Sequence, residues 1–472
     1  MLKNASVLFI GNILLAVFNL GRNILIARLL PVEQFGIATT FNVLLAAVTM
    51  AMGLNLGQLL IQAKDGDDRA FQATLQTIQI CMGLTVATLM FLGAGSYAQV
   101  MTVPEATWGF QLMALIARLG GLQHFDIYRL QREMQFLPLV FVTTAGVVIS
   151  TLAVWPLYEI FGDYRVMLYT LLLQQTIALS LSHIMARSSY RLNWDSAVVM
   201  RALTFSAPLL LNGVFLFGIF NGERLIVANR FGLEELAWFS VGFMLTMMPV
   251  NLLSKSLQSL FLPILSRHQD NDDAFSYTAV TACQATVVPG LALALGFALF
   301  GPTVIGLLYG EKYLPAVGIV VLLAVMQGIR LAQAGAVVSA LARAQSRIPL
   351  YITITRFAFI PLAFLAVLYL QVGILSLVII GIAGEIAALV LAYSMLWARL
   401  RVRISQLGPG LLLAGTVLAV IIWQVVTIKM ETGLWGGIHS GQIVPIGLLL
   451  LSPLVFRNLW AEGLALLRRR RD

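Results

Sequence analysis

The chain has 472 residues, of which 59% are hydrophobic and only 11% charged, whereas a soluble domain carries roughly 25% charged residues. So little polar surface cannot cover a water-soluble particle, and the mean hydropathy of +0.90 indicates a polytopic membrane protein whose exterior faces lipid. Lys and Arg exceed Asp and Glu to give a formal net charge of +9, and the location of this excess decides its meaning.

Long apolar segments follow one another along the chain, separated by short polar breaks. A helix needs ~20 mostly apolar residues to cross the ~30 Å hydrocarbon layer of a bilayer. Fourteen segments meet this need: 6–29, 35–61, 71–97, 108–128, 137–161, 164–184, 202–227, 237–262, 275–301, 316–341, 349–370, 374–397, 410–428 and 443–460. The fourth carries Arg118, His124 and Asp126, but without it the alternation between inside and outside would break.

The orientation of these spans follows from the positions of the cations. With both termini placed in the cytoplasm, nineteen of the 30 Lys and Arg residues fall on the cytoplasmic side, five outside and six within spans. This distribution obeys the positive-inside rule, which the inverted topology would violate by the same margin. The excess charge is therefore mainly a topology signal, and we expect no nucleic-acid partner. We interpret the basic C-terminal end as a cytoplasmic tail. The alternative is that its arginines contact anionic membrane lipids.

The sequence contains an internal duplication. The pattern D-x-A-F-x-x-T-x-x-T occurs twice, 204 residues apart, and two further matches flank it in the same order with offsets of 201 and 211. These three pairs are 68–77 with 272–281, 21–33 with 222–234, and 130–139 with 341–350. Each copy holds six spans, so both enter the membrane with the same orientation, as a parallel repeat.

This duplication predicts an all-α fold of about fourteen transmembrane helices. Two pseudo-symmetric six-helix lobes would occupy residues 1–200 and 201–405 and would face a central cavity. The remaining residues, 406–472, would form two additional helices and the basic tail.

Six cations lie within predicted spans, against three acids. Each centrally placed cation costs ~3 kcal/mol if it faces lipid, so these side chains need water, partners or an anionic ligand. The residues are Arg22, Arg118, Arg224, Lys255, Arg330 and Arg356, with Asp126, Glu223 and Glu385 as the acids. The local excess of three positive charges favours a cavity that admits a negatively charged substrate.

The sequence context separates these cations. Arg118 and Arg330 lie well within their spans, whereas Arg22, Lys255 and Arg356 lie nearer an end, from which a long side chain can reach the membrane surface. Asn12, Asn19 and Asn23 share one helix face beside Arg22, and hydrogen bonding between helices explains such a stripe as well as a binding site does.

Motifs for catalysis and for ATP binding are absent. The chain has no P-loop, no GxSxG elbow and no HExxH, its four histidines share no motif, and its two cysteines permit no disulfide framework. We therefore expect no enzyme activity, cofactor or bound metal. Transport would depend on an ion gradient, the membrane potential or a substrate gradient.

Two segments carry a family resemblance. The run 21–36, GRNILIARLLPVEQFG, followed by GLNLG at 53–57, resembles bacterial polysaccharide flippases of the Wzx type. These belong to the multidrug/oligosaccharidyl-lipid/polysaccharide exporter superfamily. The resemblance extends to about Arg403; the last two spans match in number only.

This resemblance implies a two-lobed transporter in the bacterial cytoplasmic (inner) membrane, with both termini in the cytoplasm. Such a protein alternates between inward-open and outward-open states and moves an undecaprenyl-pyrophosphate-linked oligosaccharide from the cytoplasmic to the periplasmic leaflet. Its other partners would be membrane lipids and the polysaccharide polymerase or export machinery.

The resemblance also implies roles for the intramembrane charges. Arg22, Arg118, Arg224 and Arg330 are the candidates for contact with the pyrophosphate or acidic sugars. The candidates for proton or cation coupling are Asp126, Glu223 and Glu385, although Glu223, which adjoins Arg224, is better explained by structural pairing.

Three alternatives stay open. A drug or cation antiporter of the same superfamily would share the fold, but an organic cation favours a cavity with excess acids. An integral-membrane polysaccharide polymerase or ligase would carry a large periplasmic loop, and no predicted exterior loop is long enough. A lipid II flippase, the third alternative, would also have fourteen spans and a cationic cavity and would act on a related substrate.

Overall fold

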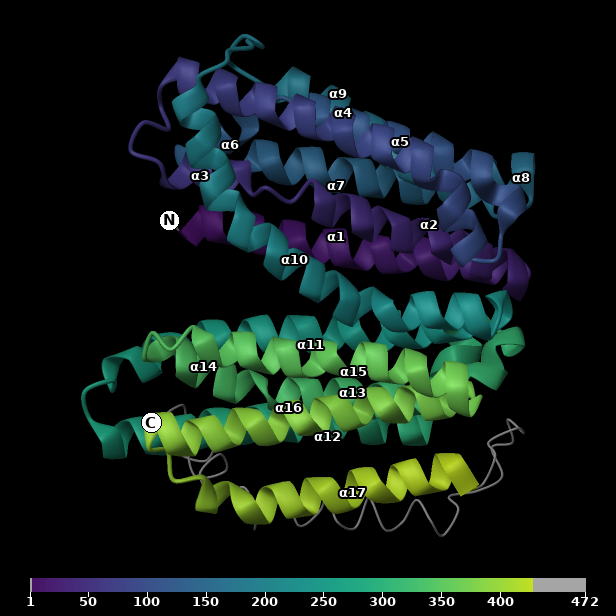
Figure 1. The fold of residues 1–472 in the computed structure, drawn as a ribbon, viewed down its shortest axis with the longest axis vertical. Coiled ribbons are helices and arrows are strands. Elements are labelled where there is room, and N and C mark those ends of the chain that lie inside the picture. The colour runs from purple at the N-terminus through teal and green to yellow at the C-terminus, as the bar shows by residue number, and fades with distance from the viewer. Residues whose placement is uncertain (1, 428–472) are drawn as a thin grey trace. The chain divides into compact units, whose positions relative to one another are not determined.

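The computed structural model describes residues 2–427 of the chain (Figure 1). This part of the chain is built from α-helices and three short 3-10 helices, η1–η3, and contains no strand. Contacts divide it into two compact units, Met1–Ala237 and Trp238 onward, which are described separately. The predicted all-helical class is confirmed. The predicted domain limits at residues 200 and 405 stay a prediction.

The first unit contains the helices up to the start of α11. Their bounds are α1 Leu2–Leu29, α2 Val32–Ala51, α3 Leu56–Gln62, α4 Arg69–Val100, η1 Pro104–Ala106, α5 Thr107–Leu122, α6 Asp126–Arg132, α7 Leu137–Leu152, α8 Val154–Phe161, α9 Arg165–Met185, α10 Ser196–Arg230 and α11 Leu233–Arg267. Helix α4 packs on α5, α1 on α7, and α7 on α9, while α10 packs on α2 and α4.

The second unit begins within α11 and continues to the end of the described residues. Its further elements are α12 Asp272–Tyr309, η2 Glu311–Ala316, α13 Val317–Ala332, α14 Ala334–Ala342, α15 Arg347–Leu370, α16 Ile374–Leu400, η3 Ile404–Leu407 and α17 Gly408–Thr427. Helix α12 packs on α13, α15 on α16, and α13 on α16.

Thirteen of the fourteen predicted spans coincide with these helices. Ten helices of the described part are long and apolar enough to cross a membrane, or eleven if α7 and α8, which meet at a 43° bend, form one span. The fourteenth predicted span, 443–460, and the arginines of the tail lie outside the described residues. The count of fourteen therefore stays a prediction, whereas a multi-pass membrane fold is confirmed.

Closely packed pairs of glycines occur at matching positions in the two copies of the repeat. A Cβ added to Gly83 would lie 2.7 Å from Cα of Gly121, and one added to Gly290 would lie 2.5 Å from the carbonyl oxygen of Gly328. Both contacts are closer than a side chain tolerates, so α4 meets α5, and α12 meets α13, backbone against backbone. The two glycine pairs are 207 residues apart, within the offsets of the sequence repeat.

Two predicted spans are broken at related places. The fourth consists of α5 and α6, with residues 123–125 between them, and the tenth consists of α13 and α14, with Gln333 between them. Each break turns polar side chains or backbone groups into the interior of a unit, where they need hydrogen-bond partners. At 123–125 the partner is Gln76 of α4, and at Gln333 it is Glu385 of α16, which belongs to the candidate site.

Candidate functional site

Arg22 is the buried cation of the first unit. It lies on α1 with only 2% of its surface exposed. Its Nη1 donates to Oε1 of Gln174 at 2.5 Å and to Oγ of Ser150 at 3.1 Å, and its Nη2 donates to Oδ1 of Asn19 at 3.0 Å. Its side chain is therefore held inside the unit. It does not extend to the membrane surface, although the position of Arg22 near the end of its predicted span would have allowed this.

All acceptors of Arg22 are neutral. Among residues 2–427 no carboxylate lies within ion-pair distance of its guanidinium, and its buried Nε has no hydrogen-bond acceptor. An ion taken out of water without a counter-charge costs several kcal/mol, and neutral hydrogen bonds offset only part of this cost. The site therefore holds a positive charge that an anion would stabilise.

Helices α7 and α9 supply two of the three acceptors, from positions fixed by close packing. A Cβ added to Gly146 of α7 would lie 2.8 Å from the carbonyl oxygen of Gln174, so the absence of a side chain at Gly146 lets α9 approach. Part of the predicted polar stripe also faces inward, since Asn23 donates to the carbonyl of Asn19 and accepts from Asn42. Asn12, the third member of the stripe, is exposed.

Glu385 is the centre of the corresponding cluster in the second unit. It lies on α16, 2% exposed, and accepts from Nε and Nη2 of Arg330 at 2.8 and 2.5 Å. Nε of Arg356 lies 3.0 Å from its second oxygen, which also accepts from Nε2 of Gln333 at 2.9 Å. Arg356 and Gln333 are further joined by a hydrogen bond. Two guanidinium groups thus share one carboxylate.

The acceptors at the centres of the two clusters occupy the same place in the repeat, whereas their arginines come from helices that do not correspond, Arg22 from α1 and Arg330 from α13. Gln174 of α9 and Glu385 of α16 are 211 residues apart, which is the offset of the third sequence match. Each side chain is the main acceptor for an arginine of its unit, as an amide for the buried Arg22 and as a carboxylate for the partly buried Arg330. Sequence reasoning missed Gln174, Ser150 and Gln333. Applying the offset to Glu385 would have found Gln174.

Two other predicted cations lie elsewhere. Arg118 is exposed on α5, where it lines a hollow of about 330 Å³ together with apolar residues of α4 such as Leu84 and Phe91. Arg224 is half-buried on α10 beside Glu223, which is 5% exposed. Arg22 and Arg118 are therefore an interior and a surface cation of the same unit, although both were predicted to line one cavity. That cavity stays a prediction.

Asp126 has a structural role that its position in the sequence did not reveal. It is fully buried at the start of α6, where it accepts from Nε of Arg129 at 2.5 Å. It also accepts from the backbone N–H groups of Arg187 and Ser188, at 2.7 and 3.1 Å. Asp126 thereby holds the connector 186–195, which leads from α9 to α10. Its role in coupling stays a prediction.

The sequence of the chain matches the model of a known protein family. Residues 25–318 match the model of a family described as polysaccharide biosynthesis protein. No curated protein sequence matches the chain.

Solved structures show the same fold. The chain is similar to the lipid II flippase MurJ in an inward closed conformation, with a TM-score of 0.71 and 13% identity over 98% of this chain and 100% of that one. It is also similar to a multidrug resistance MATE family transporter of the MOP superfamily in an inward-facing conformation. There the TM-score is 0.67 and the identity 16%, over 82% of this chain and 94% of that one. At these identities the likeness is one of fold.

Proposed function

The chain belongs to the polysaccharide biosynthesis protein family, and from this premise we propose that it is a flippase for lipid-linked oligosaccharides. Its substrate would be an undecaprenyl-pyrophosphate-linked repeat unit for exopolysaccharide or O-antigen. Movement would run from the cytoplasmic to the periplasmic leaflet of the bacterial inner membrane, by alternating access. The family match and the flippase and transporter fold support this proposal, as the resemblance of the sequence to Wzx-type flippases had implied.

The observation that carries the choice of substrate is the buried guanidinium of Arg22 with neutral partners only. A diphosphate supplies the missing negative charge and accepts several hydrogen bonds from one guanidinium. Arg330 and Arg356 carry one positive charge more than Glu385 neutralises, so the second unit also favours an anion. Arg224 and Arg118 complete the proposed set of substrate cations.

The contacts of two of the three candidate coupling acids bear on their role. Glu385 and Asp126 are each held by arginine, so a proton or cation would have to compete with a guanidinium for them. Glu223, next to Arg224 on α10, is the third buried acid. We propose that transport is driven by an ion gradient, the membrane potential or the substrate gradient rather than by ATP.

The decisive experiment is leaflet-resolved labelling of the lipid-linked sugar in a strain that lacks this protein. We expect the repeat unit to accumulate on the cytoplasmic leaflet, and a normal outward distribution would refute the flippase function. Complementation with Arg22→Ala should restore protein in the membrane but not surface polysaccharide. Lys64→Ala, which removes an exposed cation of the loop before α4, is the matched control.

An antiporter for drugs or organic cations is the second candidate, because MATE transporters share the fold. The arginine-held Glu385 argues against it, since a cationic substrate prefers a carboxylate that is not already neutralised. Cells that lack the protein would then retain more of a fluorescent organic cation and make normal surface polysaccharide. An enzymatic role as polymerase or ligase has less support, because the structural neighbours are transporters and flippases.

A further inference from the structure

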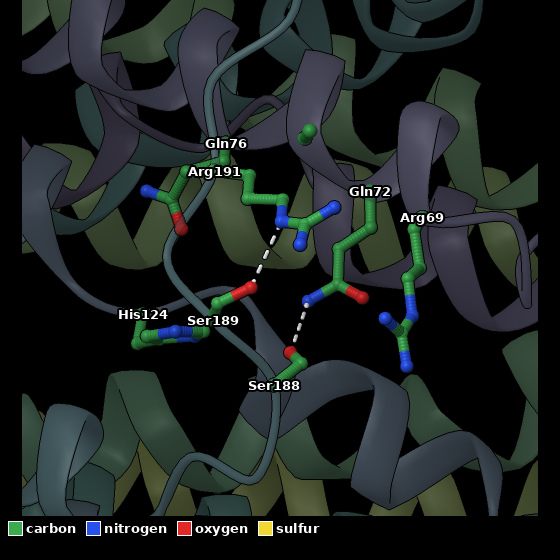
Figure 2. A pocket seen from close by; sticks show the side chains of 8 residues that line it. Arg69, Gln72, Gln76, His124, Ser188, Ser189 and Arg191 are labelled. Atoms are coloured by element: carbon green, nitrogen blue, oxygen red, sulfur yellow. Dashed lines mark hydrogen bonds between the residues drawn. The ribbon is translucent and has the colours of Figure 1, made fainter.

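A polar pocket lies at the start of α4, away from the buried arginines. Its walls come from α4, from the break between α5 and α6, and from the connector 186–195. Figure 2 shows the side chains that line it, with those of Arg69 and Arg191 on either side of Gln72. The other labelled residues are Gln76, His124, Ser188 and Ser189.

The second unit shows what the first unit lacks at this place. The second residue of the pattern D-x-A-F is Asp273 in the second unit and Arg69 in the first. Asp273 forms an ion pair of 2.8 Å with Arg403, which lies in the segment that follows α16. The connector after α9, the helix that corresponds to α16, supplies Arg191. Where one unit has an ion pair, the other has two arginines.

Three other arginines around this end of the first unit have carboxylate partners. Arg129 pairs with Asp126, Arg132 with Asp67, and Arg201 with Asp65. Arg191 donates from Nε to the hydroxyl of Ser189, and neither it nor Arg69 has an ion pair among the described residues. Two like charges that line one pocket repel each other unless an anion lies between them.

We propose that this pocket binds a phosphate-type anion through Arg69 and Arg191. Guanidinium groups match the tetrahedral oxygens of phosphate, and the hydroxyl of Ser189, which accepts from Arg191, keeps its own O–H to donate. The amide groups of Gln72 and Gln76 already donate to other groups of the protein. The enclosed volume is about 20 Å³, room for about one water-sized group, so a phosphoryl oxygen enters while the rest of the ligand stays at the mouth. A sugar or a nucleobase does not fit.

The position along α4 decides which phosphates can reach the pocket. Helix α4 has 32 residues and is therefore about 48 Å long, which exceeds the ~30 Å hydrocarbon layer. Its apolar segment begins only at residue 71, after the charged residues of the loop, so the first turn, with Arg69, extends to the level of the lipid headgroups or beyond. Both a lipid headgroup phosphate and a free phosphate have access there. The bound anion would connect α4 to the connector, which Asp126 holds from the other side.

The test uses the purified full chain in nanodiscs of phosphatidylcholine. Inorganic phosphate is added at constant ionic strength against chloride, and the shift of the thermal unfolding temperature is followed. A parallel sample replaces part of the lipid with phosphatidylglycerol in phosphate-free buffer. We expect a saturable increase in at least one arm. An increase with free phosphate assigns a soluble ligand, an increase with phosphatidylglycerol assigns a lipid headgroup, and the absence of both overturns the proposal.

Variants test whether the shift of the unfolding temperature arises from anion binding in the pocket. Arg69→Asp copies the ion pair of the second unit, so the protein should fold and its apparent affinity for the anion should fall about tenfold or more. Arg191→Gln should have the same effect by a different change, which keeps the test valid if Arg69→Asp does not fold. Lys64→Ala, an exposed cation outside the pocket, should respond as the unmodified chain does. Equal shifts in all four proteins would overturn the proposal.

Discussion

Gln174 in the first unit and Glu385 in the second occupy the same position of the repeat, and both accept hydrogen bonds from an arginine that is buried in the first unit and partly buried in the second. The two units also share a packing feature on other helices, since a pair of facing glycines joins α4 to α5 in the first and α12 to α13 in the second. The difference is chemical. Glu385 supplies a counter-charge to Arg330 and Arg356 from within the protein, whereas Gln174 gives Arg22 a hydrogen bond without a charge.

This difference separates structural from functional arginines. A cation that already has a carboxylate contributes to the stability of its unit and leaves little for a ligand to gain. A cation held only by neutral acceptors gains more from an incoming anion. The comparison therefore supports the first unit as the place where an anionic substrate group has the stronger effect.

The largest effect is expected from removal of the carboxylate in the second unit. Glu385→Gln leaves two partly buried guanidinium groups without a counter-charge, and breaking a buried pair in this way costs ~3–5 kcal/mol. The free energy of unfolding in detergent should fall by this order. If Glu385→Gln were as stable as the unmodified chain, the second unit would not depend on its internal ion pairs.

The reciprocal change tests the first unit. Gln174→Glu gives Arg22 an internal carboxylate, which would compete with the diphosphate of the proposed substrate. We expect surface polysaccharide or flipping in proteoliposomes to fall by roughly 10- to 100-fold, the loss of one charge-assisted interaction, without loss of stability. Gln175→Glu is the control, because it adds the same charge next to Gly120 on α5 instead. Full activity of Gln174→Glu would contradict an anionic ligand at Arg22.

The shared packing can be tested in both units at once. Gly83→Ala and Gly290→Ala each introduce a Cβ that meets backbone, so each should lower the free energy of unfolding by ~1–3 kcal/mol. Gly93→Ala, also on α4, has nothing within 4 Å of the new Cβ and should be neutral or slightly stabilising. Unequal losses at Gly83 and Gly290 would show that the two units do not rely equally on this contact.

The smallest effect is expected at the surface. The guanidinium of Arg201, hydrogen-bonded to Asp65 in the loop before α4, holds the pKa of that carboxyl below its ordinary value. The pair therefore stabilises the folded state above the unfolded pKa of ~3.9, and this contribution disappears as the pH falls through the lower folded pKa. Because both side chains are exposed, Asp65→Asn should change the free energy of unfolding at pH 7 by less than ~1 kcal/mol.

If Asp65→Asn lowered the free energy of unfolding by more than this, exposed ion pairs would stabilise the first unit as strongly as the partly buried pairs stabilise the second. The measurement is a denaturant titration of both proteins at pH 7 and at pH 3. The difference between them should shrink at the lower pH, where Asp65 of the unmodified chain begins to lose its charge.

Hydropathy alone predicted the helices well, because a span needs only a sufficient length of apolar residues. The breaks at 123–125 and at Gln333 were not predicted, since they depend on polar groups that find partners on other helices. The site shows the same limit. Arg118 and Arg330 lie at similar depths of related spans, yet one is exposed and the other is paired with Glu385. Depth follows from the sequence position, whereas the partner depends on the neighbouring helix.

The glycine contacts have a mechanical consequence. Where backbone meets backbone, no layer of side chains remains that could change rotamers and let one helix slide on the other. Helices α4 and α5 should therefore move as one rod during a transport cycle, and so should α12 and α13. Bending would then occur at the helix breaks, residues 123–125 and Gln333, which would act as hinges between rigid segments.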